Sequence, residues 1–386
     1  MRKILFVTGI RSEYDILYSV MRAVEKSPAL ELRVVVTGAH LVPMYGSTVR
    51  EIEKDGFPIS ARIQSLLNSD SPSARVKSAA IQLASLVDVI SGEKPHFLVA
   101  PMDREEGVTV ALAGAYMRIP VAHLGGGETA EDFNVDNPIR HAVTKLAHLH
   151  LVTTERSAQR VIQMGEEAWR VHVVGNPGLD RFCAIPDMGP EELWRVLGCR
   201  PVQGPYAVVI QHSILTEPEN AGKQMQQTLD SLVALGIPAF IGHPNSDAGG
   251  QQILQVISNY ASAHPELLHS HGNLPREAFV NLMRRAHVLV GNSSCGIVEA
   301  PSLGLPAVNV GPRQRGREHA DNVQFVDHDT AQIQSAIERA VRDAEYRRKV
   351  KSCANPYGDG KSGERIARIL SDQVIDERLL NKLNTF

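Results

Sequence analysis

Two serines stand where an apolar run gives way to a helical pattern, which is an arrangement suited to binding an anion. The run ends at Gly291, and Ser293 and Ser294 follow before apolar residues recur at helical spacing. The first N–H groups of a helix lack internal partners, and its dipole favours negative charge there. Three arginines, the side chain best suited to phosphate, follow within residues 313–317. The segment predicts a site for a phosphorylated, nucleotide-linked ligand, although serines that only cap an ordinary helix would give the same pattern.

Carboxylates and one histidine follow other apolar runs, at points where buried strands would end. Asp103 and Glu128 come after two runs of the first half, and Asp136 stands a little further on. His212 closes the first run of the second half, where histidine is seldom placed for packing. Groups of this kind that converge from separate loops can remove a proton from carbon and return one elsewhere, because the surroundings set the pKa of each group.

Each carboxylate also has a purely structural interpretation. Asp103 could form a surface ion pair with Arg104, which would contribute little stability. Glu128 could stand exposed after a flexible glycine turn. Residues 136–138 fit the start of a helix, with Asn137 as the N-cap and Pro138 at the first helical position. This interpretation leaves the carboxylate of Asp136 free to point into a site.

The elements that must position these groups alternate along the chain. Apolar runs of strand length recur, and a longer helical pattern follows each of them, which is typical of parallel sheets covered on both faces. The expected strands are Ile4–Val7, Leu32–Val36, Phe97–Ala100, Val121–His123, His150–Val152, Val171–Val174, Ala207–Ile210, Ala239–Ile241, Val288–Val290 and Ala307–Val310. The expected helices are Tyr14–Lys26, Val76–Ser91, Gly107–Met117, Ile139–Leu146, Ser157–Met164 and Gly363–Leu380.

A break in composition divides this pattern into two halves. Residues 175–178 read Gly-Asn-Pro-Gly, a stretch rich in proline and glycine follows, and the alternation then restarts. We therefore predict an α/β protein of two Rossmann-like domains that face each other across a cleft. The first domain comprises residues 1–175 and is completed by 363–386, and the second comprises 176–362. Ligands of such folds bind outside the carboxyl ends of the strands.

Composition excludes several classes of protein. The chain has 386 residues, which is enough for two domains, and its net charge of −3 speaks against a nucleic-acid partner. No segment approaches the about 20 continuous apolar residues of a membrane helix, and the apolar start is too short for a signal peptide. The four cysteines and fifteen histidines are dispersed without metal-ligand spacing. We expect a reduced, cytoplasmic protein that holds no metal.

Several short motifs occur in an order that resembles one enzyme family. They are Thr8-Gly9-x-Arg11, Val36-Thr37-Gly38-Ala39-His40-Leu41, Asp103-Arg104, Gly126-Gly127-Glu128, Ile139 to His148, Pro244-Asn245-x-Asp247-Ala248-Gly249, Gly291 to Gly296, and Arg313-Gln314-x-Gly316-Arg317. In this combination the chain resembles the hydrolysing UDP-N-acetylglucosamine 2-epimerases of sialic-acid and legionaminic-acid biosynthesis. The resemblance implies a fold of the glycosyltransferase-B type and a sugar nucleotide as substrate.

The reaction that the resemblance implies begins with removal of the C2 proton and anti-elimination of UDP to give a 2-acetamidoglucal. Water then adds at C1 while C2 is protonated on the other face, and N-acetylmannosamine is released. By position, Asp103, Glu128 and Asp136 would be the acid and base groups, and His212 would assist departure of UDP. The family needs neither a metal nor a redox cofactor, and it implies a homodimer or homotetramer.

The resemblance also implies a set of binding residues. Arg11, Ser293 and Ser294 would hold the phosphates, Glu299 would grip the ribose hydroxyls, and His40 would lie near the sugar. The remaining substrate-binding candidates are Arg104, Asn245, Asp247, Gly272 and Arg313.

The chain departs from the family next to the sugar pocket. Met102 stands where the family usually has glycine, and Glu105 and Glu106 follow Arg104 where an aromatic or aliphatic residue is more common. The loop from Glu128 to the next helix also carries an additional residue. These changes bear on which hexosamine is bound rather than on the reaction.

Other functions remain compatible with parts of the pattern. The same reaction on UDP-2,4-diacetamido-2,4,6-trideoxyglucose is the nearest alternative, and a glycosyltransferase would share the fold and the nucleotide site. Residues 292–296 nearly spell the nucleophile elbow of a serine hydrolase, but no convincing acid accompanies His319 or His328. A non-enzymatic sensor of sugar nucleotides would not need the acid and base groups.

Overall fold

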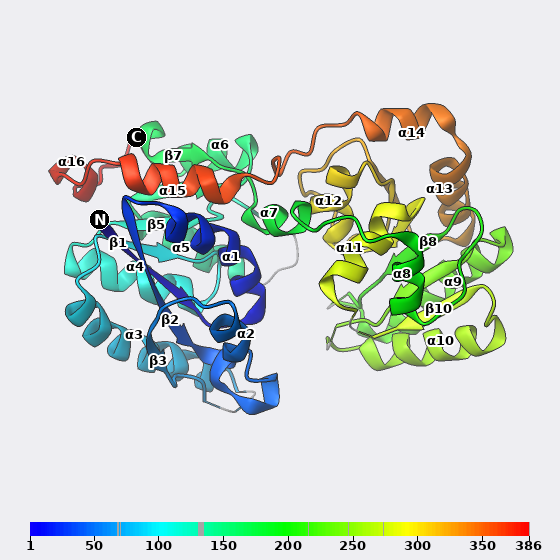
Figure 1. The fold of residues 1–386 in the computed structure, drawn as a ribbon, viewed down its shortest axis with the longest axis horizontal. Coiled ribbons are helices and arrows are strands. Elements are labelled where there is room, and N and C mark those ends of the chain that lie inside the picture. Colours follow the sequence, from blue (N-terminus) through cyan, green and yellow to red (C-terminus); the bar gives the residue numbers. More distant parts are fainter. Residues whose placement is uncertain are drawn as a thin grey trace. The chain divides into compact units, whose positions relative to one another are not determined.

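Each half of the chain folds around its own parallel β-sheet (Figure 1). The computed structural model describes residues 1–67, 69, 71–129, 135–214, 216–245, 247–272 and 274–385. The first compact unit contains the described residues of 1–129, 134–181 and 357–386. The second contains the described residues of 182–356. The chain thus passes to the second unit after Arg181 rather than after Gly175, and it returns at Tyr357 rather than at Gly363.

The first unit contains a seven-stranded sheet in the order β3-β2-β1-β4-β5-β6-β7. All neighbouring strands in it are parallel. The strands are β1 (Arg2–Thr8), β2 (Leu30–Thr37), β3 (Ile59–Ile63), β4 (Phe97–Ala100), β5 (Val121–Leu124), β6 (Leu149–Val152) and β7 (Val171–Val173). The second unit contains a six-stranded parallel sheet in the order β10-β9-β8-β11-β12-β13. Its strands are β8 (Ala207–Ile210), β9 (Ala239–Gly242), β10 (Leu268–His271), β11 (Val288–Gly291), β12 (Ala307–Val310) and β13 (Val323–Val326).

Helices cover both faces of each sheet, because the central strands are apolar on both sides. In β1, Ile4 and Phe6 belong to one buried cluster, and Leu5 and Val7 belong to another on the opposite face. The helices of the first unit are α1 (Arg11–Lys26), α2 (Val49–Lys54), α3 (Pro72–Glu93), α4 (Glu105–Met117), α5 (Asp136–Leu146), α6 (Glu155–Gln163), α15 (Ser362–Asp372) and α16 (Glu377–Leu380). The helix α7 (Pro177–Cys183) spans the boundary. The helices of the second unit are α8 (Pro190–Leu197), α9 (Ala221–Leu235), α10 (Gly250–Ala263), α11 (Arg276–Arg285), α12 (Cys295–Val298), α13 (Thr330–Arg342) and α14 (Ala344–Lys351).

All ten expected strands are present, and the prediction of two Rossmann-like units is confirmed. Three strands were not predicted: β3, β10 and β13. Each of them lies at an edge of its sheet and carries polar side chains, such as Arg62 in β3 and Gln324 in β13. An edge strand is only partly covered, so its sequence lacks the continuous apolar run by which central strands are recognised. Among the described residues, no helix is long and apolar enough to cross a membrane.

The segment after the second unit completes the first. Helix α15 packs along α1, and the Cα of Gly363 lies so close to α1 that a Cβ there would be 2.5 Å from the carbonyl oxygen of Ser19 (Figure 1). Beyond it, the fully buried Arg170 donates hydrogen bonds to the carbonyl oxygens of Leu379 and Arg378, both at 2.7 Å. Glu166, equally buried, contacts Lys382 at 2.7 Å. Buried charged groups therefore hold the returning segment in place.

Replacing Arg170 should release this segment. An Arg170→Met variant leaves several buried carbonyl oxygens without their donor, so we expect a loss of about 3–5 kcal/mol in the free energy of unfolding. Chemical denaturation would measure the loss, and limited proteolysis should show cleavage within 377–382. The matched control is Arg118→Met, whose ion pair with Glu377 at 3.1 Å is largely exposed and should contribute about 0–1 kcal/mol. Equal stability of the two variants would contradict this account.

Candidate active site

The candidate residues of the first unit follow the carboxyl ends of its strands. Arg11 follows β1, His40 follows β2, Asp103 follows β4 and Glu128 follows β5, while Asp136 is the first residue of α5. Since all of these strands are parallel, their following loops emerge at one edge of the sheet. The sequence prediction that these groups share an edge agrees with the strand order.

Arg140 joins the carboxylate of Asp103 to the backbone of Glu128. Its nearly buried guanidinium contacts the carboxylate of Asp103 and donates to the carbonyl oxygen of Glu128 at 2.8 Å. The hydroxyl of Thr153, at the end of β6, donates to the Glu128 carboxylate at 2.8 Å. Asp103 and Glu128 are therefore oriented by groups on two other elements. The sequence placed Arg140 in a motif but indicated no role for it.

The expected cap of α5 has a different role. The helix begins at Asp136, so Asn137 is already its second residue rather than the N-cap. The side-chain oxygen of Asn137 accepts a hydrogen bond from Arg140 at 2.9 Å. The capping interpretation was wrong because Arg140, one turn further along the helix, offers a charged donor.

Two buried carboxyl groups lie beneath this edge: Glu13, for which the sequence indicated no role, and Glu106, which it marked only as a departure from the family pattern. Glu13 accepts a hydrogen bond from the backbone N–H of Gly9 at 2.9 Å, and Glu106 lies 3.5 Å from Arg104. A Cβ on Gly9 would come within 1.9 Å of the Glu106 carboxylate, so only glycine fits there. Burial raises the pKa of Glu13 well above its ordinary value, and the negative charge of Glu106 raises it further. Burial likewise raises the pKa of Glu106, against the opposing charge of Arg104.

His40 and Arg11 have different surroundings. The imidazole of His40 is buried, with Thr8 at 3.0 Å from one ring nitrogen and Thr48 at 2.7 Å from the other. Burial lowers its pKa to about 4, so it is neutral. Both nitrogens are engaged by threonines, and the ring joins the end of β1 to the residue before α2. Arg11 is largely exposed and lies 3.9 Å from Glu51.

In the second unit, Asn292 joins the ends of two neighbouring strands. It accepts from the backbone N–H of His212 and donates to the carbonyl oxygen of His212, both at 2.8 Å. The carbonyl oxygen of Asn292 in turn accepts from Arg313 at 3.0 Å and from Gln314 at 3.1 Å. This buried asparagine thus fixes His212 and Arg313 relative to the turn that carries Ser293.

His212 has a defined proton arrangement. Its Nδ1 accepts a hydrogen bond from the backbone N–H of Asn245 at 3.2 Å. Burial lowers the pKa of His212 to about 4, and the charge of Arg313 acts in the same direction. The ring is therefore neutral with its proton on Nε2, which makes it a hydrogen-bond donor. Asn245 also contacts Asp247 at 2.6 Å, whereas Gly272 follows β10 at the same edge of the sheet.

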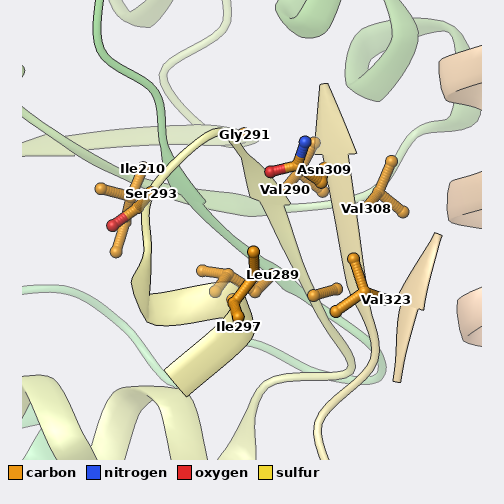
Figure 2. Close-up of a pocket in the computed structure, with 11 residues that line it drawn as sticks. Ile210, Leu289, Val290, Gly291, Ser293, Ile297, Val308, Asn309 and Val323 are labelled. Carbon is orange, nitrogen blue, oxygen red and sulfur yellow. The ribbon is translucent and has the colours of Figure 1, made fainter. Parts of the chain in front are cut away.

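The two serines lie on the turn from β11 to α12, and Figure 2 shows Ser293 on this turn. Ser294 occupies the N-cap position, but its side chain makes no capping hydrogen bond, while Ser293 accepts from Cys295 at 3.3 Å. Behind the turn, Gly291, Ser293 and Asn309 help to line a small cavity of about 10 Å³, at the lower limit for one water molecule. Capping of α12 therefore does not account for Ser294, whose hydroxyl is not used by the helix.

Glu299 ends this segment with an unusual carboxylate. Among the described residues, its Oε2 is buried and has no hydrogen-bond partner. Burial raises the pKa of Glu299, against the opposing charges of Arg317 and Arg276. Such a group is suited to accept hydrogen bonds from a ligand that supplies hydroxyls.

A family model described as UDP-N-acetylglucosamine 2-epimerase matches residues 22–371. The chain belongs to this family. The resemblance inferred from the motifs is thereby confirmed, and the protein is a UDP-sugar 2-epimerase. Among the described residues, no group of three histidines, cysteines or carboxylates could hold a metal ion.

Two relatives and one solved structure give the scale of the similarity. A Legionella pneumophila protein named UDP-N,N'-diacetylbacillosamine 2-epimerase (hydrolyzing) is 36% identical over 388 residues, which cover 100% of both chains. A UDP-N-acetylglucosamine 2-epimerase of Neisseria meningitidis is 31% identical over 340 residues, covering 88% of each chain. A crystal structure of UDP-GlcNAc 2-epimerase from Neisseria meningitidis bound to UDP-GlcNAc superposes with a TM-score of 0.75 at 21% identity, covering 96% of this chain and 100% of that one. The shared fold is of the glycosyltransferase-B type.

The structure accommodates the residue that departs from the family's usual glycine. Met102 has a φ of 28°, in the region that favours glycine, and its carbonyl oxygen lies 2.8 Å from Nε2 of His123. Its thioether lies against Gly125, where a Cβ would come within 2.5 Å of the sulfur. Met102 is therefore tolerated in this epimerase because Gly125 leaves room for it.

The buried acids predict a stability that depends on pH. Because the pKa of Glu13 is raised on folding, the folded protein keeps a proton that the unfolded chain releases near pH 4.5, and stability is lost as the pH rises above that value. A Glu13→Gln variant keeps the acceptor for Gly9 but has no proton to lose. Its gain in the free energy of unfolding over wild type should therefore grow between pH 5 and pH 8 in denaturant titrations. A difference that does not vary with pH would contradict this explanation.

Proposed function

We propose that this epimerase is a hydrolysing enzyme that converts UDP-N-acetylglucosamine to N-acetylmannosamine and UDP. The observation that supports the proposal most directly is a pair of oriented carboxylates at the strand ends: Arg140 contacts that of Asp103, and Thr153 donates to that of Glu128. A second candidate substrate is UDP-2,4-diacetamido-2,4,6-trideoxyglucose, because the 36% identical relative is named for UDP-N,N'-diacetylbacillosamine. The two sugars differ at C4 and C6, so the same chemistry at C1 and C2 serves both.

In the proposed first half-reaction, a carboxylate accepts the proton from C2 of the sugar. The electron pair of the C2–H bond forms the C1=C2 double bond, and UDP leaves with the electron pair of the C1–O bond. In the second half-reaction, the pair of the double bond takes up a proton at C2 on the opposite face, while the oxygen of water bonds to C1 and gives one proton to a carboxylate. Asp103, Glu128 and Asp136 are the proposed proton carriers, since two faces of the ring require more than one.

The second unit supplies groups suited to the departing diphosphate. His212 Nε2 carries the ring proton because Nδ1 accepts from Asn245, so a neutral imidazole can donate to a phosphate oxygen. Arg313 adds a positive charge that Asn292 holds in place. The hydroxyl of Ser294 is not used by the helix and adds a further donor. We assign the ribose hydroxyls to Glu299, whose buried Oε2 lacks a partner among the described residues.

The acid and base assignment predicts a separation of turnover from binding. Asp103→Asn, Glu128→Gln and Asp136→Asn keep their shapes but cannot carry a proton, so turnover should fall roughly 10²–10⁴-fold. Affinity for UDP, measured by calorimetry, should remain close to that of wild type. The wild-type enzyme should place deuterium at C2 of the released sugar in D₂O, because the proton that is removed is not the one returned.

Proton NMR of the reactions with both UDP-sugars would measure turnover and the deuterium content of the product. The substrate with the larger kcat/KM identifies the sugar, and the released sugar reports the deuterium. Near wild-type turnover in all three variants, or a product without deuterium at C2, would exclude the elimination mechanism and favour a transferase of the same fold.

The proton position on His212 predicts that two amide replacements will differ. The amide nitrogen of Gln can take the place of Nε2 and still donate, whereas that of Asn is too short to reach the same point. His212→Gln should keep more UDP affinity than His212→Asn, with a difference corresponding to one charge-assisted hydrogen bond, about 1.5–3 kcal/mol. Calorimetry with UDP would measure it. Equal losses in the two variants would show that Nε2 does not donate to the diphosphate.

A further inference from the structure

Glu105, one of the residues that departs from the family pattern, is held by an arginine from another helix. Arg75, near the start of α3, donates to Oε2 of Glu105 from Nε at 3.0 Å and from Nη2 at 2.8 Å. The Glu105 side chain is only 16% exposed, and its other oxygen lies 3.3 Å from Arg104. Burial alone would raise the pKa of Glu105, but the hydrogen bonds from Arg75 and the charge of Arg104 hold it below its ordinary value. Glu105 is therefore an anion with a fixed orientation.

The same guanidinium also reaches a proposed proton carrier. Nη2 of Arg75 lies 3.8 Å from Oδ1 of Asp136, the first residue of α5. Helices α3, α4 and α5 cover one face of the first sheet, and α4 packs against both of the others. Their packing brings the first turns of three helices together, so a residue of α3 meets the first residues of α4 and α5.

The position of Arg75 is unfavourable for its own helix. The start of a helix carries partial positive charge, and a cation there is disfavoured. Ser71 caps α3 by accepting from the N–H of Ala74 at 3.3 Å, and Gln82 bonds to Thr109 of α4 at 2.7 Å. The helix is thus anchored without Arg75. A cation at this end of α3 does not stabilise the helix, so Arg75 is expected to have a role outside α3.

We propose that Arg75, held by Glu105, is a positioning residue that fixes the carboxylate of Asp136 for proton transfer. This inference rests on the proposed function, in which Asp136 carries a proton. Arg75 from α3 and Arg104, the residue before α4, both act on Asp136, and the Glu105 anion lies between these two arginines. Glu105 stands where the family more often has an apolar residue. Its role here is to hold the Arg75 guanidinium in the position that faces Asp136.

The test is the pH dependence of kcat in an Arg75→Gln variant, assayed with UDP-N-acetylglucosamine and its 2,4-diacetamido-2,4,6-trideoxy analogue. Loss of a positive charge beside a carboxylate disfavours the ionised form, so the limb of the profile that reports Asp136 should move to higher pH by roughly one unit. The direction is the same whether Asp136 acts as acid or base. The residual activity of Asp136→Asn identifies that limb, because the limb should be absent there.

Companion variants separate positioning from folding and from binding. Arg75→Lys keeps the charge and should leave the limb near its wild-type position. Glu105→Gln removes an anion from the same cluster, so it should lower kcat by releasing the guanidinium without moving the limb to higher pH. The control is Arg62→Gln, which breaks an exposed ion pair with Glu53 at 2.7 Å in the same unit and should change neither kcat nor the profile. KM, UDP affinity and melting temperature should stay near wild type throughout.

Each contrary outcome has one meaning. An unmoved limb in Arg75→Gln, together with an Asp136→Asn variant whose weak residual activity lacks that limb, overturns the role of Arg75 and leaves the proposed function standing. A change in KM or UDP affinity without a shift of the limb also overturns it, because Arg75 would then bind substrate. Full turnover by Asp136→Asn removes Asp136 from the mechanism, and the inference fails with it.

Discussion

Both units depend on one constraint, which is that parallel strands deliver the loops that follow them to a single edge of the sheet. Asp103, Glu128 and Thr153 follow β4, β5 and β6, three neighbours in the first sheet. His212 and Asn292 follow β8 and β11, which are neighbours in the second. Side chains far apart in sequence therefore meet without long excursions of the chain, and short polar contacts are enough to fix them.

Buried charges perform most of that fixing, and the fold compensates their cost locally. Removing an ion from water is costly unless other charges or hydrogen bonds replace its hydration. Arg140 meets a carboxylate, a carbonyl oxygen and an amide oxygen. Glu13 and Glu106 are less fully compensated, since one oxygen of each lacks a hydrogen-bond partner among the described residues, and their raised pKa values reflect that. The Asp103 carboxylate at the end of β4 is thus held in place, while the buried acids Glu13 and Glu106 beneath it lower the stability of the fold.

The sequence predicted what depends on local pattern. Apolar runs identified the central strands, and the residues that follow them identified the carboxylates and His212. Pairings between distant residues were not predictable, because the contact between Arg75 and Glu105 follows from how α3 packs on α4. Glutamate is almost never fully buried, so nothing in its neighbourhood along the chain marked Glu106 as interior. The edge strands were missed for a related reason, since their partial exposure admits polar residues.

The path of the chain also fixes an order of assembly during synthesis. The first sheet is translated before residue 175, yet its covering helix α15 and the partners of Arg170 belong to residues 357–385. The described residues of the second unit, by contrast, all belong to 182–356. On the ribosome the second unit can therefore fold as soon as it emerges, whereas the first waits with α1 and the neighbouring part of its core not yet covered by α15. Translation that stops after the second unit would leave Ile366 and Leu370 missing from the core of the first, so a chain shortened by a few dozen residues would retain every proposed catalytic group and lack the packing that supports them.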